Sequence, residues 1–139
     1  MTTADIFRCA AEVAAALSSR EDLPELGSFG VWSTGVIMRG AHDFGPWANI
    51  ATAAEWARVF DTDVEISLRY GSVGSVDVRF ELAGHRIRVT DTIGTAEAYQ
   101  LGALLRMPLS SGTAITVTPD RIATALTELA TATVQKGQC

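Results

Sequence analysis

The sequence predicts a single α+β domain over residues 1–139, with a largely antiparallel sheet packed against helices on one face. Two observations carry this prediction: several segments have the apolar spacing of amphipathic helices, and the segment 64–91 alternates between apolar and polar residues. No repeat or long linker divides the chain. A chain of 139 residues that is 47% apolar can bury one core without a metal or a disulfide framework.

Four segments have the spacing of helices, and they cover residues 3–19, 46–60, 95–106 and 118–133. Their expected caps or first residues are Thr2 or Thr3, Pro46, Thr95, and Thr118 with Pro119. Pro108 prevents the third helix from continuing. We expect the chain to fray after about residue 133, where the fourth pattern ends.

Strands are expected between and after these helices, which gives the order α-β-α-β-β-β-α-β-α. The segment 29–39 is rich in Val, Ile and Trp, and it is predicted as one strand that bends near Gly35. A short strand is expected at 113–117.

The clearest strands lie at 64–70, 76–82 and 85–91, where every second residue is apolar. A two-residue turn at Ala83–Gly84 would place Glu81 opposite Arg86 and gather the apolar residues on one face. The preceding five-residue loop would place Arg69 opposite Asp77.

The formal net charge is -5, with ten acids and five arginines in residues 1–70 and six acids and six bases thereafter. A protein that grips nucleic acid phosphates needs clustered positive charge, so this balance makes nucleic acid binding an unfavoured class. The first residues lack the basic region of a secretory signal, and no run of 18 apolar residues occurs. We therefore expect a cytoplasmic protein that does not span a membrane.

Motifs of enzymes and metal sites are missing from the sequence. It contains no HExxH, CxxC, GxGxxG or phosphate-binding loop, and its histidines are His42 and His85. Cys9 and Cys139 have no metal-ligand spacing, and Cys9 is expected to pack as a small hydrophobe on the first helix. We expect no cofactor and no metal, and the sequence favours a protein without enzymatic activity over an enzyme.

The loop between the first strand and the second helix is a candidate ligand site. Arg39, His42, Asp43 and Trp47 combine cationic, acid/base, acidic and aromatic groups near a helix N-terminus, which suits an anionic or planar ligand. A structural alternative is favoured. In it, Asp43 forms a turn or cap, Trp47 anchors the core, and the other two side chains are solvated.

A second candidate is an anion or partner surface formed by Arg79, Arg86 and Arg88 on the outer face of the 76–91 hairpin. The alternative is a solvated ionic ladder, because Glu81 opposes Arg86 and Asp77 lies diagonal to Arg88. His85 is expected to be exposed or packed rather than catalytic.

Three tryptophans, Trp32, Trp47 and Trp56, form a third feature. In a small domain such residues are more often core residues than recognition residues. Trp56 stands at the edge of the apolar stripe of the second helix, and an outward-facing edge would be a partner surface.

Several features occur together along the chain: an Ala-rich first helix, Asp22-Leu23-Pro24, a Trp-containing strand, the helix from Trp47 to Phe60, and the segment 84–90. In this arrangement the sequence resembles small uncharacterised proteins of actinobacteria and of their phages or plasmids. The resemblance implies no known activity and assigns no functional residues.

These observations together favour a non-enzymatic protein-interaction or regulatory module, with another protein or a second copy of the chain as its partner. One alternative is a small-ligand-binding protein or hydrolase that uses the 39–47 loop. A less favoured alternative is a DNA-associated protein that uses the arginine hairpin.

Overall fold

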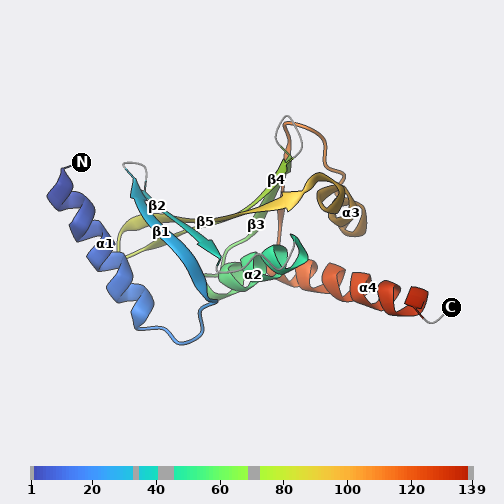
Figure 1. Ribbon diagram of the computed structural model, residues 1–139, viewed down its shortest axis with the longest axis horizontal. Coiled ribbons are helices and arrows are strands. Elements are labelled where there is room, and N and C mark those ends of the chain that lie inside the picture. The colour runs from blue at the N-terminus through green and yellow to red at the C-terminus, as the bar shows by residue number, and fades with distance from the viewer. Residues whose placement is uncertain (1, 33–34, 41–45, 69–72, 138–139) are drawn as a thin grey trace.

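The computed structural model describes residues 2–32, 35–40, 46–68 and 73–137. These residues form four helices and one six-stranded sheet (Figure 1). The helices are α1 (Thr3–Ser18), α2 (Pro46–Val59), α3 (Thr95–Leu105) and α4 (Pro119–Gly137). The strands are β1 (Leu26–Trp32), β2 (Gly35–Gly40), β3 (Val64–Leu68), β4 (Val73–Leu82), β5 (His85–Gly94) and β6 (Ala114–Val117).

The sheet has the strand order β1-β2-β5-β4-β3-β6, and every neighbouring pair except β2 and β5 is antiparallel. In Figure 1, α2 and α4 lie below the sheet and α1 stands beside β1. This arrangement confirms the predicted α+β class with a largely antiparallel sheet.

The segment 29–39 corrects the prediction of one bent strand, because it forms the two antiparallel strands β1 and β2. Gly35, where β2 begins, explains why the chain does not continue straight. Its φ of 135° is rarely adopted by other residues, and a Cβ there would lie 2.5 Å from the carbonyl oxygen of Arg86. Only glycine fits at this close approach. Residues 33 and 34, between the strands, lie outside the described residues.

The hairpin of β4 and β5 has the predicted register, with Glu81 opposite Arg86 and Val78 opposite Val89. Ala83 and Gly84 form its turn with φ values of 53° and 79°. Positive φ at both central residues is typical of a type I′ turn, whose twist matches that of the flanking strands. The two-residue turn therefore fixes which side chains share a face.

The register of β3 against β4 differs from the prediction. Asp77 lies opposite Glu65, where the sequence predicted Arg69, and Leu68 lies opposite Gly74. β4 begins at Val73, three residues earlier than expected, so the connection is shorter. The shift is an even number of residues, and each strand therefore keeps its apolar side chains on the predicted face. Arg69 itself lies outside the described residues.

The core lies between the helices and one face of the sheet, which we call the core face. Its largest fully buried side chains are Trp56, Met38, Ile50, Ile66, Ile87, Leu101 and Ile122. Trp56 is 1% exposed and stacks with Phe60 and Phe80. The alternative that Trp56 faces a partner is therefore wrong.

The helix ends follow the sequence with two differences. Thr2 caps α1 in a reciprocal pair with Asp5, and Thr118 accepts a hydrogen bond from the backbone of Arg121 at the start of α4. Thr95, however, is the first residue of α3, and Gly94 takes the capping position. α4 remains helical to Gly137, beyond the predicted end near residue 133. None of the helices in the described part of the chain could cross a membrane.

Candidate functional site

The second face of the sheet, which we call the open face, carries the polar residues that alternate with the core residues. The register places on this face Ile37 and Arg39 of β2, Ser75, Asp77, Arg79 and Glu81 of β4, and Arg86, Arg88, Thr90 and Thr92 of β5. Trp32 of β1 lies on the same face, opposite Gly35, and is 57% exposed. Strand pairing thus gathers residues from distant parts of the sequence on one surface.

Two adjoining hollows mark the open face. The larger, of about 480 Å³, has Arg79, Glu81 and Arg86 in its lining. The smaller, of about 290 Å³, is lined by Arg39 together with Ser75, Thr90, Thr92 and others. Ile37 and Arg88 line both hollows, so the two form one groove. The larger volume is in the range of ligand sites.

The charge of the groove has the opposite sign to that of the whole chain. Its lining contains Arg39, Arg79, Arg86 and Arg88 against the single acid Glu81. The chain as a whole has a formal net charge of -5. The groove is therefore a local concentration of cationic and hydroxyl groups on an acidic protein, which favours an anionic ligand.

Two of the four arginines are engaged within the protein. The Arg88 Nε donates to the Asp77 Oδ1 at 2.7 Å, and the Arg79 Nη1 lies 3.1 Å from the Glu65 Oε2. The first contact is the predicted diagonal pair. The second was not predicted, and it follows from the register that places Glu65 of β3 opposite Asp77 of β4.

Arg39 and Arg86 differ from these two, since neither side chain makes an ion pair or hydrogen bond with any residue that the structure describes. Arg86 and Glu81 lie opposite each other as predicted, yet no ion pair joins them. The solvated ladder is therefore incomplete, and two guanidinium groups beside the groove are available to an anion.

Asp77 holds the centre of the open face in place. It is 3% exposed, and it accepts hydrogen bonds from Arg88 and, at 2.9 Å, from the Ser75 hydroxyl. Burial would raise the pKa of Asp77, but hydrogen bonds from Arg88, Thr90 and Ser75 outweigh burial and lower the pKa below its ordinary value. A buried, ionised carboxylate thus positions Arg88 between the two hollows.

Two of the four residues of the predicted 39–47 site, Arg39 and Trp47, are among the residues that the structure describes. Arg39 lies on the open face, whereas Trp47, in the first turn of α2, is partly buried against the core. His42 and Asp43 lie outside the described residues. The structure brings Arg39 to the hairpin arginines, because β2 pairs with β5. Arg39 of the first candidate site thereby lines the same groove as the three arginines of the second.

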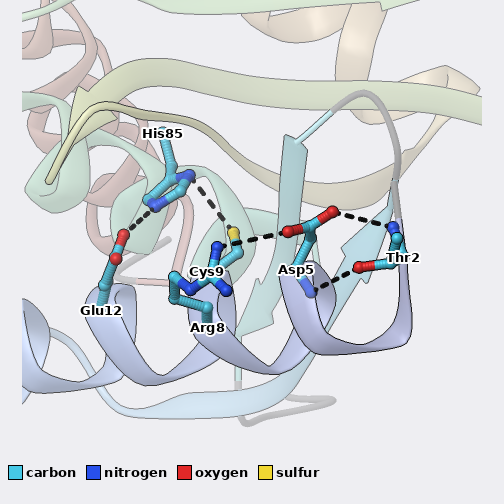
Figure 2. Close-up of polar contacts among 6 residues, drawn as sticks. All are labelled: Thr2, Asp5, Arg8, Cys9, Glu12 and His85. Carbon is cyan, nitrogen blue, oxygen red and sulfur yellow. Dashed lines mark hydrogen bonds and ion pairs between the residues drawn. The ribbon is translucent and has the colours of Figure 1, made fainter.

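A separate polar cluster joins α1 to the β4–β5 turn (Figure 2). The Cys9 Sγ lies 3.4 Å from the His85 Nδ1, and the His85 Nε2 lies 2.6 Å from the Glu12 Oε2. Cys9 is buried as predicted, and burial, followed by the charge of Glu12, raises the pKa of its thiol.

Sequence reasoning missed this cluster, since Cys9 and His85 are 76 residues apart. The spacing of Cys9 and Glu12 on one helix face was the readable signal. The cysteine and the glutamate contact opposite sides of the imidazole and do not converge on a common point. Within the described parts of the chain, no group of three or more His, Cys, Asp or Glu residues could hold a metal ion.

The fold and the groove define an α+β protein with an open, arginine-lined sheet face. No protein-family model, curated protein or solved structure matches the chain. The function is therefore inferred from the geometry of the groove.

Proposed function

We propose that this protein is a non-enzymatic, cytoplasmic interaction module that holds an acidic segment of a partner protein in the groove of the open face. The observation that carries the proposal is the pair of guanidinium groups of Arg39 and Arg86, one in each hollow, which have no ion-pair or hydrogen-bond partner among the described residues. Guanidinium binds carboxylates through two parallel hydrogen bonds, and the groove places such donors beside hydroxyl groups.

The shape of the groove favours an extended segment over a compact ligand. It follows β5 from Arg86 to Thr92, a distance of roughly 20 Å at the rise of a β-strand. Arg86 and Arg39 belong to different hollows, so an occupant must carry separated anionic groups to reach both. A peptide with several acidic side chains meets this requirement.

Nucleic acid fits the open face less well. Binding to single strands without sequence preference combines a cationic groove with aromatic side chains on which successive bases stack. Among the described residues of the open face, Trp32 is the aromatic one. Glu81 at the larger hollow and the acidic net charge also oppose a polyphosphate backbone.

The experiment that tests the proposal is fluorescence anisotropy with a labelled, end-capped hexaglutamate peptide, with hexalysine and a short oligothymidylate as comparison probes. We expect the wild-type protein to bind hexaglutamate best and the affinity to fall as salt is raised. Replacing both of these arginines (Arg39→Ala with Arg86→Ala) should weaken binding by on the order of tenfold or more, since each lost charge-assisted hydrogen bond contributes about 1.5–3 kcal/mol.

A matched control removes the same charge elsewhere. Arg8 pairs with Asp5 on α1, and Arg58 pairs with Asp120 on α4, both away from the groove. The double variant Arg8→Ala with Arg58→Ala should bind hexaglutamate like the wild type. Equal weakening in both double variants would show that only the net charge matters. Tighter binding of oligothymidylate than of hexaglutamate would indicate that the partner is a nucleic acid and not a protein.

A further inference from the structure

The contact between α1 and the β4–β5 turn has a chemistry that the proposed function does not use. A thiol, an imidazole and a carboxylate lie in series there, from Cys9 through His85 to Glu12 (Figure 2). His85 stands at the first position of β5, and the other two residues occupy one face of α1.

The contact with Glu12 favours one tautomer of a neutral imidazole. An ionised carboxylate only accepts hydrogen bonds, so a neutral His85 that donates to Glu12 does so from Nε2, at 2.6 Å. The Nδ1 of that tautomer carries no proton, and it faces the Cys9 Sγ at 3.4 Å. This arrangement presents a base to the thiol and orients that base with a carboxylate, as nucleophilic cysteine sites require.

We infer that Cys9 is an oxidation site for a small hydroperoxide, with His85 as the base that takes the thiol proton and Glu12 as the residue that positions His85. The thiol proton moves to the His85 Nδ1 as the sulfur attacks one peroxide oxygen and the O–O bond breaks. The leaving hydroxide receives that proton and departs as water. The sulfur is oxidised by two electrons to a sulfenic acid, and the peroxide is reduced.

The burial of Cys9 restricts the oxidant to a small molecule. The residue is 3% exposed and belongs to the core cluster, so a bulky acyl or alkyl reagent has no path to the sulfur. Hydrogen peroxide is only slightly larger than water. Burial also raises the pKa of the thiol, which leaves little free thiolate and makes the transfer of its proton to the imidazole necessary.

The experiment follows oxidation of the full chain by hydrogen peroxide at neutral pH. After each interval the peroxide is removed with catalase, dimedone is added in urea so that it reaches the sulfenic acid at the buried site, and mass spectrometry measures the adduct. The Cys139→Ser variant reports Cys9 alone, and the Cys9→Ser variant reports Cys139 as the reference thiol. We expect Cys9 to react faster than Cys139 by on the order of tenfold, since positioned bases contribute at least that much in enzymes. In urea, the two thiols should react alike.

Variants of His85 and Glu12 test whether Cys9 is oxidised because a base accepts its proton or only because its sulfur is exposed. In the Cys139→Ser background, His85→Gln keeps a polar side chain but removes the base, and it should slow oxidation by on the order of tenfold. Glu12→Gln should slow it less, because the imidazole remains. Val13→Ala loosens the packing of α1 beside the cluster and should not slow oxidation.

Two results would overturn the inference. One is oxidation of Cys9 at or below the rate of Cys139. The other is a His85→Gln variant that oxidises as fast as its parent or faster, since a purely structural His85 would shield the sulfur rather than activate it. Circular dichroism of each variant confirms that its helices are retained.

Discussion

The two faces of the sheet are built from the same strands but carry different side chains. On β5, Ile87 and Val89 are buried under the helices, whereas Arg86 and Arg88, which alternate with them, line the groove. The core face is held by apolar burial and by the stack of Trp56, Phe60 and Phe80. The alternation of a β-strand thus separates core packing from the polar groove at the level of neighbouring residues.

The largest expected effect contrasts two neighbours on β4. Phe80 faces the core, and its ring stacks on that of Phe60 with a centroid distance of 3.8 Å. The substitution Phe80→Ala should lower the free energy of unfolding by about 3 kcal/mol, through lost burial and a residual cavity. Urea unfolding measures this loss.

The matched substitution Arg79→Ala tests the other side of the same strand. Arg79 is exposed and pairs with Glu65 at the surface, so its loss should cost less than about 1 kcal/mol. Similar losses for Phe80→Ala and Arg79→Ala would contradict the assignment of the two faces.

Asp77, although it belongs to the open face, is expected to stabilise the fold. Asp77→Asn removes a buried carboxylate that accepts from Arg88 and Ser75, and it should cost roughly 1–3 kcal/mol, because Arg88 loses its charged partner. A variant as stable as the wild type would show that the carboxylate does not organise the groove.

The same carboxylate predicts a dependence on pH. The folded protein lowers the pKa of Asp77 below its value in the unfolded chain, about 3.9. Its contribution is therefore complete above that unfolded value and is lost as the pH falls through the lower folded pKa. The stability difference between the wild type and Asp77→Asn should shrink as urea unfolding is repeated from neutral to acidic pH. A constant difference would contradict this linkage.

The smallest expected change in stability belongs to Arg86. Its side chain has no partner among the described residues, so Arg86→Ala should alter the free energy of unfolding by less than about 0.5 kcal/mol. Binding of hexaglutamate should nevertheless weaken. A variant that loses stability but keeps its affinity for hexaglutamate would show that Arg86 stabilises the fold and does not bind the peptide.

The sequence predicts the parts of this fold that depend on short-range patterns. The two-residue turn at Ala83–Gly84 fixes the register of β4 and β5, and with it the face of Arg79, Arg86 and Arg88. The β3–β4 register could not be predicted, because the length of the connection is not set by a turn signal. The β1–β2 hairpin was missed because glycines interrupt its alternation.

The composition of the groove depended on a contact that no local pattern encodes. Arg39 joins the hairpin arginines through the parallel pairing of β2 with β5, whose partners lie about fifty residues apart in the sequence. The same holds for Cys9 and His85, which come together only when α1 packs beside the β4–β5 turn. Local signals identified the residue types, and long-range pairing decided which of them share a site.

The most direct test of the proposed binding groove is a titration of the isotope-labelled protein with hexaglutamate, followed by backbone amide NMR. We expect chemical-shift changes along β2, β4 and β5 that centre on Ile37, Arg88 and Thr90 and disappear in the double variant Arg39→Ala with Arg86→Ala. Changes confined to α1 or α4, or changes of equal size in that double variant, would contradict the assignment of binding to the open face.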